Sequence, residues 1–313
     1  MLAAILVGQN QPLIVDEVEL PSKLDVGQVL VKVHTSGICG SQLGEISGVK
    51  GPDKFLPHLM GHEGCATVLE VGPGVKNVKI DDLVVLHWRK GYGIESKTPV
   101  YKWRGKKLNA GWVTTFNTHA VVSENRCTRI PLDTNKDVAA LFGCAVTTGF
   151  GVIENNCNLQ IGESVVVFGS GGIGLNIIQA ASLRSAWPII AVDLFDEKLD
   201  LALKMGATHA INNSKGSFKK ALSNIIKTEK VDVFVDNTGL PEVIELGYEF
   251  IKSKGKLVLV GVPKLGNKIN IFTLPLHFGK TIIGSHGGES EPGVDIKRYL
   301  NLINQRQVPM REI

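Results

Sequence analysis

The sequence predicts an α/β protein with two domains: a β-rich N-terminal domain and a doubly wound parallel sheet covered by helices. The chain has 313 residues, which is enough for two hydrophobic cores. Up to about residue 145, short alternating apolar segments are separated by Gly, Pro and Asp. From Glu163 onward, uninterrupted apolar strands alternate with helical patterns. This second sequence pattern is typical of a parallel sheet buried on both faces.

The N-terminal half contains the short strands expected of a barrel-like domain. MLAAILVG turns polar at Gln9, so we expect a first strand and not a leader peptide. Further strands are predicted from the segments VLVKVHTSG, ATVLEVG, DLVVLHW and THAVVSENRCTRIP. Many short strands at this spacing indicate a compact β-rich domain with barrel-like closure.

The C-terminal half alternates strands with helices. The strand SVVVF leads through a glycine turn into the helical segment LNIIQAASLRSA, and the strand PIIAVDLF leads into the helix EKLDLALKMGA. VDVFVDNTG, a helix from Pro241 and the strand KLVLVGVP continue the pattern. Strands alternating with helices of this length predict βαβ units and therefore a parallel sheet.

Composition and charge exclude several classes of protein. The formal charge of +4 is too small for a dedicated nucleic-acid binder, and no apolar run reaches the length of about 18 residues that a membrane span needs. The five cysteines are odd in number and show no disulfide spacing, which favours a reducing, cytoplasmic setting. Cys65, Cys127 and Cys157 are interpreted as small buried hydrophobic residues.

A glycine-rich turn after the strand SVVVF indicates a dinucleotide site. The turn reads Gly169-Ser170-Gly171-Gly172-Ile173-Gly174 and opens a helix. Its glycines permit the tight turn, the approach of a pyrophosphate and close helix–strand packing, and the pyrophosphate faces the helix N-terminus. About twenty residues later, Asp193 ends the second strand, where a carboxylate binds an adenosine ribose and repels a 2′-phosphate. The pattern predicts a Rossmann domain that prefers NAD to NADP. The alternative is a surface aspartate in a Rossmann-like domain with another ligand.

Two cysteines and a histidine in the first half form a candidate metal set. Cys39 lies in a glycine-flanked turn, His62 follows Gly61, and Cys144 lies where the two halves meet. Catalytic zinc commonly has three protein ligands and one open position. Because the spacing is wide, the residues alone leave a zinc triad and three unrelated side chains equally open.

These motifs, in this order, resemble those of the zinc-dependent alcohol dehydrogenases of the medium-chain dehydrogenase/reductase (MDR) superfamily. GICGS resembles the first zinc-ligand turn, GHEGCATVLEVGPGV the GHE motif, and GCAVTTG the third-ligand segment. VFGSGGIG, VDLFDEK, LVGVP and TIIGSHGG fall where the family has its cofactor strands. The resemblance implies a GroES-like catalytic domain over residues 1–145, to which residues 286–313 return in a shortened form. It implies a Rossmann NAD-binding domain over residues 146–285.

The resemblance also implies roles for individual residues. Cys39, His62 and Cys144 are the expected ligands of one catalytic zinc, and the glycines around His62 and Glu63 are expected to leave room for metal and cofactor. Glu63 is either a transient ligand or a structural carboxylate, and Ser41 takes the substrate proton. The expected cofactor contacts are Thr148, the glycine turn (Gly169, Gly171, Gly172, Ile173, Gly174), Asp193, Lys198, Val260 and Val262. Lys198 is alternatively a solvated helix residue.

Four features depart from the family pattern. The segment HWRKGYGIESKTPVYKWRGKKLNAGW has none of the four cysteines that hold a structural zinc in many members, so no structural zinc is expected. Gln42 replaces an aspartate behind the ligand histidine, where its amide oxygen can still accept the imidazole N–H. Gly44 replaces a histidine that ends the proton relay. The sequence stops at Ile313, before the family's last helix and strand.

The cysteine-free segment has its own character. Its residues 87–107 include seven basic residues and four aromatic residues against the single acid Glu95. The preferred interpretation is a solvated loop whose aromatic residues anchor it to the domain. The alternative is a segment that lines the substrate site, where His87 and Trp88 contact an anionic or sugar-like substrate. His58 and His119 are interpreted as structural.

The resulting hypothesis is an NAD-dependent, zinc-containing alcohol dehydrogenase (EC 1.1.1.-). It oxidises a primary or secondary alcohol or reduces the corresponding carbonyl; polyols stay open, although polyol relatives commonly have glutamate where Cys144 stands. Two alternatives remain: a zinc-free reductase of the same superfamily, and a non-catalytic NAD-binding protein with this fold. The expected partners are a small-molecule substrate and a second copy of the chain in a homodimer, with no nucleic acid and no membrane.

Overall fold

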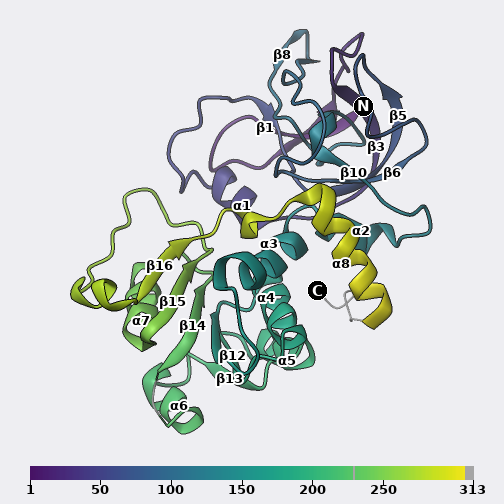
Figure 1. Cartoon of the computed structure of the whole chain (residues 1–313). Helices are drawn as coiled ribbons and strands as arrows, with labels where there is room; N and C mark the ends of the chain where they lie inside the picture. Colours follow the sequence, from purple (N-terminus) through teal and green to yellow (C-terminus); the bar gives the residue numbers. More distant parts are fainter. Residues whose placement is uncertain (228–229, 307–313) are drawn as a thin grey trace. The chain divides into compact units, whose positions relative to one another are not determined.

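The fold is given by a computed structural model that describes residues 1–227 and 230–306 (Figure 1). The chain divides into two compact units. Unit 1 consists of residues 1–147 and the described part of the segment that begins at Glu291, and unit 2 of residues 148–290. Of the expected return of residues 286–313 to the first domain, residues 307–313 lie outside the described part of the chain.

Unit 1 is built from two antiparallel sheets and a small hairpin. A five-stranded sheet has the order β10-β6-β5-β3-β9, a three-stranded sheet the order β2-β1-β4, and β7 pairs with β8. The strands are β1 (Leu2–Leu6), β2 (Ile14–Glu17), β3 (Gln28–Ser36), β4 (His58–Leu59), β5 (Gly64–Val71), β6 (Leu83–Leu86), β7 (Tyr101–Trp103), β8 (Lys106–Leu108), β9 (His119–Ser123) and β10 (Cys127–Arg129). The helices are α1 (Gly40–Ile46), the 3₁₀ turn η1 (Glu124–Arg126), α2 (Lys136–Leu141) and α8 (Pro292–Arg306).

Two hydrophobic clusters hold unit 1 together. One fills the inner face of the five-stranded sheet, where alternate residues such as Val29, Val31, Ala66 and Val68 are fully buried. The other packs β1 and β4 against the β7–β8 hairpin. Alternation of buried and more exposed residues is what a sheet with one solvated face requires, and it is present in the middle of β3 and β5. Strand β6 is buried throughout, so the predicted period-two pattern is not found there.

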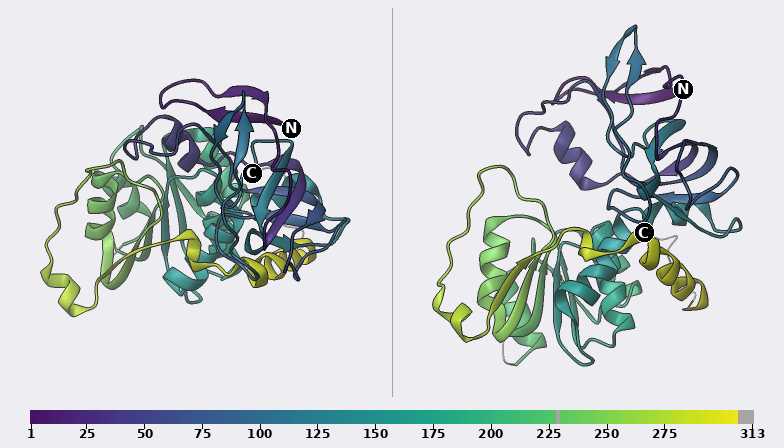
Figure 2. Two further views of the ribbon diagram at one scale, coloured as in Figure 1. Left: turned by 90° about the horizontal axis from the view of Figure 1, so that it is seen from above. Right: turned by 45° about the horizontal axis from the view of Figure 1, so that its top comes forward.

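Unit 2 is a six-stranded parallel sheet with helices on both faces (Figure 2). The strand order is β13-β12-β11-β14-β15-β16, the order of a dinucleotide-binding sheet whose topology reverses between its first and fourth strands. The strands are β11 (Val165–Phe168), β12 (Ile189–Asp193), β13 (His209–Asn212), β14 (Val231–Asp236), β15 (Ile251–Leu259) and β16 (Thr281–Gly284). The helices are α3 (Ala145–Gly151, which begins in unit 1), the π-helix η2 (Val152–Cys157), α4 (Gly172–Leu183), α5 (Asp196–Lys204), α6 (Phe218–Ile225), α7 (Pro241–Phe250), and the 3₁₀ turns η3 (Leu274–Phe278) and η4 (Gly287–Glu289).

One predicted strand is divided in two. The segment THAVVSENRCTRIP forms β9 and β10, with η1 between them. Glu124 begins η1, and its buried carboxylate accepts the backbone N–H groups of Lys76, Asn77 and Ile94 at 2.6–2.8 Å. An inward carboxylate with three backbone donors turns the chain at this point, and periodicity alone does not reveal such a long-range bond.

Candidate metal centre and cofactor site

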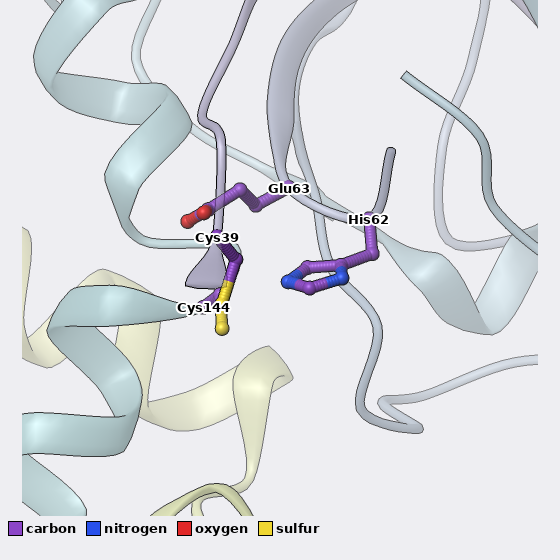
Figure 3. Close-up of side chains that lie close together, drawn as sticks. All are labelled: Cys39, His62, Glu63 and Cys144. Carbon is purple, nitrogen blue, oxygen red and sulfur yellow. The ribbon is translucent and has the colours of Figure 1, made fainter. Parts of the chain in front are cut away.

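Four potential metal ligands converge in unit 1 (Figure 3). Cys39 is the N-cap residue of α1, His62 and Glu63 lie between β4 and β5, and Cys144 directly precedes α3. The sulfur atoms, an imidazole nitrogen and a carboxylate oxygen all lie within 4.8 Å of one another. Figure 3 shows the His62 ring facing the two sulfur atoms. The tertiary structure therefore places all four side chains around a common point.

The protonation of these groups is strongly perturbed. A hydrogen bond with the Cys144 thiol lowers the pKa of Cys39 to about 3, and the nearby His62 ring adds to this effect, against the opposing effect of burial. The proton shared between the two sulfur atoms raises the pKa of Cys144. Burial raises the pKa of Glu63 to about 7. Three groups that form anions thus meet in a poorly solvated place, where a cation would favour their charged forms.

The donor set fits zinc. Thiolate and imidazole are the ligands that zinc prefers, and three protein ligands are usual in catalytic sites. The Nε2 atom of His62 is buried and has no hydrogen-bond partner in the structure. A buried imidazole nitrogen without a partner is costly unless something binds it, so this atom indicates a ligand position.

The glycines next to the GHE motif have a different purpose from the one the sequence predicted. Gly61 has φ +92°, and a Cβ there would lie 2.2 Å from the Thr115 hydroxyl; a Cβ at Gly64 would lie 2.9 Å from the Thr35 carbonyl oxygen. These glycines allow the backbone to pack closely and do not make room for a metal. Gly37 and Gly143 make room for the Glu63 side chain, since a Cβ at either would lie 2.6–2.7 Å from it.

Helix α1 begins at the first ligand and positions it. Its first turn directs backbone N–H groups at the Cys39 sulfur, including that of Ser41, which further lowers the Cys39 pKa. Gln42 is buried, and its Oε1 accepts the Cys39 N–H at 3.1 Å. The structure therefore uses this amide oxygen to close the N-terminus of α1, whereas the sequence pointed to a bond with the ligand histidine.

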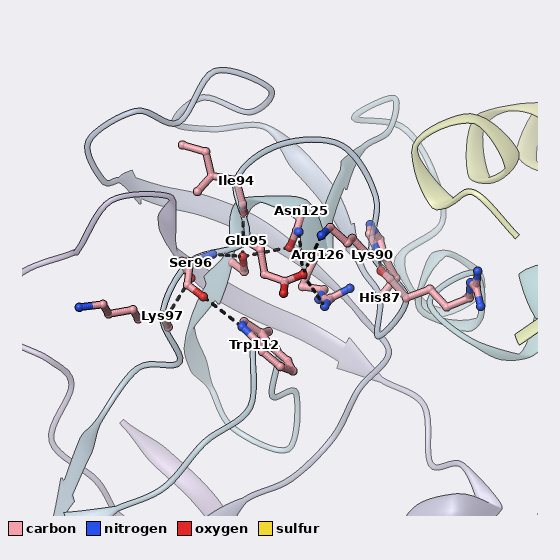
Figure 4. A network of polar contacts seen from close by, with 11 residues as sticks. His87, Lys90, Ile94, Glu95, Ser96, Lys97, Trp112, Asn125 and Arg126 are labelled. Carbon is pink, nitrogen blue, oxygen red and sulfur yellow. Dashed lines mark hydrogen bonds and ion pairs between the residues drawn. The ribbon is translucent and has the colours of Figure 1, made fainter. Parts of the chain in front are cut away.

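Hydrogen bonds anchor the cysteine-free segment to unit 1 (Figure 4). The Ser96 N–H donates to the Ser123 hydroxyl at 2.9 Å, which anchors the segment, and within the segment the Trp112 indole donates to the Ser96 carbonyl at 3.0 Å. Glu95 lies 3.4 Å from both Lys90 and Arg126. His87 is buried, with Nδ1 bonded to the Arg89 carbonyl and Nε2 to Thr128, and burial lowers its pKa to about 4.

The aromatic residues of this segment divide between the two interpretations. Tyr101 is fully buried and accepts the Val121 N–H at 2.7 Å. The Trp103 indole donates to Asp16 at 2.9 Å. Both side chains therefore fix the β7–β8 hairpin to the rest of the unit. Trp88 is partly exposed, and its indole hydrogen bond to Cys144 favours the thiolate of that ligand.

The glycine-rich turn in unit 2 is the candidate phosphate cradle, and its glycines differ in their surroundings. Gly171 is the N-cap residue of α4, which begins at Gly172. A Cβ at either of them would have no atom within 4 Å, so both face open space. A Cβ at Gly174 would lie 2.0 Å from the Gly169 carbonyl oxygen, and Gly169 has φ +97°. The structure thus separates two glycines that face outward from two that the backbone itself requires.

The remaining candidate cofactor residues lie at the carboxyl ends of the sheet strands or, for Thr148, shortly after the candidate ligand Cys144 in the chain. The Asp193 carboxylate accepts the N–H groups of Ser170 and Leu194, each at 2.8 Å. Lys198 lies 3.9 Å from it, above the Phe195 ring. The other candidates are placed as follows: Ile173 in the first turn of α4, Thr148 buried in α3, and Val260 and Val262 directly after β15.

One donor set was missed from the sequence. Glu45, Asp53 and His58 also bring their ligand atoms within 4.8 Å of one another. His58 was interpreted as structural, and the two carboxylates carried no motif. No local signal marks the three together, since a helix end, a loop and a strand contribute one residue each. Separately, none of the described helices has the length and apolar character needed to cross a bilayer.

Comparison with known proteins identifies both halves of the chain. Residues 25–132 match the family model "Alcohol dehydrogenase GroES-like domain", and residues 172–305 match "Zinc-binding dehydrogenase". An alcohol dehydrogenase class-3 from Cereibacter sphaeroides is 30% identical over 96% of this chain and 88% of its own length. An S-(hydroxymethyl)glutathione dehydrogenase from Escherichia coli is 31% identical over 91% and 84%.

Solved structures agree with these matches. An alcohol dehydrogenase zinc-binding domain protein from Burkholderia ambifaria superposes with a TM-score of 0.90 at 28% identity, over 99% of this chain and 90% of that one. Benzyl alcohol dehydrogenase from Acinetobacter calcoaceticus gives 0.88 at 26% identity, over 99% and 91%. The similarity therefore spans both units.

Proposed function

We propose how this site works from one premise: the chain belongs to the zinc-dependent alcohol dehydrogenase family of the MDR superfamily. It is an NAD-dependent oxidoreductase that transfers a hydride between an alcohol, or its aldehyde or ketone partner, and NAD(H). The observation that carries the residue assignment is the convergence of Cys39, His62 and Cys144, with a buried imidazole nitrogen that has no partner.

Cys39, His62 and Cys144 hold the zinc in this proposal. Cys39 is kept in place by the Gln42 amide and by the start of α1. Glu63 stands behind the ligands, where its carboxylate accepts the Ala145 N–H at 3.4 Å, and it serves as an occasional fourth ligand. One zinc per chain is bound at this position, and no structural zinc is bound by the cysteine-free segment.

Each component then contributes a defined property. When bound, zinc supplies a Lewis acid that lowers the pKa of an alcohol hydroxyl, and NAD supplies the acceptor for the hydride. Ser41, two residues after the first ligand, accepts the hydroxyl proton. Gly44 has no side chain to pass this proton on, so water or the cofactor hydroxyls carry it to solvent. Trp88 borders the ligand Cys144 and contacts the substrate.

The cofactor is held mainly by backbone. Gly171 and Gly172 offer their open side to the pyrophosphate, and the α4 N-terminus adds a favourable dipole. Asp193 has lone pairs left for the adenosine ribose hydroxyls, and Lys198 lies beside it. Thr148 and the backbone of Val260 and Val262 contact the nicotinamide.

The finer assignments are also proposals. The substrate is a primary or secondary alcohol, with an anionic or sugar-like one as the alternative that the basic segment 87–107 favours. The catalytic domain comprises residues 1–145 and the returning C-terminal segment, and the NAD-binding domain residues 146–285. The five free cysteines favour a cytoplasmic protein.

A homodimer through unit 2 completes the proposal. Strand β16 pairs with β15 alone in the described sheet, so its outer edge is available to a second copy. Phe272 and Phe278, next to this strand, are 70% and 68% exposed, and exposed apolar side chains at a sheet edge favour association. Light scattering of the purified chain tests this: a monomer mass at micromolar concentration would contradict it.

Two measurements test the central proposal. Metal analysis of the purified chain should find close to one equivalent of zinc that a thiol-directed reagent releases. Turnover with NAD and a panel of alcohols should be lost when that zinc is removed and return when it is restored. Turnover without zinc would indicate a zinc-free reductase, and NAD binding without any turnover would indicate a protein that only binds the cofactor.

A further inference from the structure

A second group of metal-ligating side chains lies in unit 1, apart from the four residues of the candidate metal centre. Glu45 belongs to the last turn of α1, Asp53 to the following loop and His58 to β4. The His58 Nε2 atom lies 2.8 Å from Asp53 Oδ2 and 3.7 Å from Glu45 Oε1. Three oxygen and nitrogen ligands from separate elements therefore surround one point.

Each nitrogen of the His58 ring has a hydrogen-bond partner. His58 Nδ1 lies 2.9 Å from the Leu59 carbonyl oxygen, which can only accept a hydrogen bond. On the other side, Nε2 donates to Asp53 Oδ2 at 2.8 Å, because a carboxylate can only accept; a bound ion would take the place of this proton. A histidine that binds a metal usually donates its other ring N–H to a carbonyl or carboxylate, and Nδ1 has that role here.

Hydrogen bonds also fix the position of Asp53, whose carboxylate faces the His58 ring. Asp53 Oδ1 accepts the Phe55 N–H at 2.8 Å, and the Asp53 N–H donates to Gln9 at 3.3 Å. The side chains of Asp53 and His58 are only 8% and 10% exposed, whereas that of Glu45 is 39% exposed. Two ligands are thus fixed by the fold, and the third is free to adjust at the side open to solvent.

We propose that Glu45, Asp53 and His58 bind a divalent transition-metal ion such as Zn²⁺, with water completing the coordination. One imidazole and two carboxylates suit zinc or manganese, and the absence of a thiolate makes this site weaker than the cysteine-containing one. The ion joins the end of α1 to β4. Because Cys39 begins α1 and His62 follows β4, a bound ion braces the segment that connects these two ligands of the candidate metal centre.

Equilibrium dialysis of the full-length protein against Zn²⁺ at neutral pH tests this. The wild type is expected to bind a second, weaker equivalent in addition to the first. His58→Gln and Asp53→Asn should lose only the second equivalent, while alcohol oxidation at saturating NAD is retained. Glu45→Gln should weaken the second binding by more than about tenfold, the lower end of the loss seen when only an outer partner of a ligand is changed.

Matched variants separate this inference from the proposed function. Cys144→Ser should lose the first equivalent and keep the second, so the two proposals fail independently. His34→Gln removes a histidine of the same unit whose partner is Thr67 at 2.8 Å, and it should bind both equivalents. Crystals soaked in Zn²⁺ should show anomalous scattering at the zinc edge beside His58 Nε2.

Several results would overturn the inference. One is a wild type that saturates at a single equivalent; another is a second equivalent that survives in all three variants of the group. Imidazole ¹⁵N chemical shifts that show His58 doubly protonated and insensitive to Zn²⁺ would establish a plain ion pair with Asp53. If circular dichroism shows that His58→Gln does not fold, the partly exposed Glu45→Gln decides the outcome.

Discussion

The metal centre and the glycine-rich turn are built in opposite ways. The candidate zinc ligands are side chains at positions 39, 62 and 144, brought together by three separate elements. The candidate phosphate cradle is backbone from six consecutive residues, Gly169 to Gly174. A site made of distant side chains loses its ligand when one side chain changes, whereas a site made of local backbone loses it when a side chain is added. The predictions below test this contrast.

The largest effect is expected from Cys144→Ser. The hydroxyl that replaces the sulfur is a poor zinc ligand, and zinc contributes several kcal/mol of charge stabilisation in the transition state. We therefore expect zinc content to fall well below one equivalent and kcat/KM for alcohol oxidation to fall by about a thousandfold or more. Metal analysis and steady-state kinetics measure both.

Cys65→Ala is the matched control for that variant. Cys65 is fully buried in β5 near the GHE motif, but it is not one of the converging ligands. It should retain zinc, with a stability loss of about 1 kcal/mol for the small cavity. Equal loss of zinc in both variants would show that the ligand assignment is wrong.

Two glycine substitutions in the cradle should act differently. Gly174→Ala places a Cβ 2.0 Å from the Gly169 carbonyl oxygen, so it should destabilise unit 2 by about 3 kcal/mol. Gly172→Ala meets no protein atom within 4 Å; it should keep the free energy of unfolding within about 1 kcal/mol but raise the Kd for NAD at least tenfold. Denaturant unfolding and NAD titration of both variants test this. Unimpaired NAD binding by Gly172→Ala would contradict the assignment of the cradle.

A smaller effect is expected from Asp193→Asn. The amide no longer repels a 2′-phosphate, and its NH₂ group cannot accept the Ser170 or Leu194 N–H. The ratio of kcat/KM for NAD to that for NADP should therefore fall by about tenfold, which corresponds to about 1.4 kcal/mol. Kinetics with each cofactor measure the ratio. An unchanged ratio would mean that Asp193 does not face the ribose.

The smallest effect is expected at Asp232, which lies at the amino end of strand β14 in the same sheet. Asp232 accepts the Ser164 hydroxyl at 2.7 Å and lies 2.8 Å from Lys252; although burial opposes them, these partners lower its pKa. A carboxyl group whose pKa is lower in the folded state than in the unfolded state stabilises the fold at pH values above its unfolded-state pKa. This stabilisation is lost as the pH falls through the folded-state pKa. Asp232→Asn should therefore lower the free energy of unfolding by about 1 kcal/mol at neutral pH. The difference between the variant and the wild type should narrow below about pH 4. A difference that does not depend on pH would contradict this account.

The two regions also differ in how far they could be predicted. Gly169–Gly174 and Asp193 follow strands directly, and hydrophobic periodicity located those strands: β11, β12 and β14 lie where they were expected. Cys39, His62 and Cys144 could be grouped from residue type alone, but only the resemblance to the family favoured a zinc triad over three unrelated side chains. The bond from Gln42 to the Cys39 N–H and the packing of Gly61 against Thr115 could not be predicted, because both depend on atoms that folding brings near.

The sequence by itself determined the β-rich first half, the alternation of strands and helices in the second half and the glycine turn, because these depend on side-chain period and on backbone freedom within a few residues. Only the tertiary structure decided which cysteines share a proton, where the Gln42 amide points and that His58 lies between two carboxylates. The reason is physical: coordination and buried hydrogen bonds depend on distances of a few ångströms between atoms far apart in the chain, and those distances are set by the packing of whole elements.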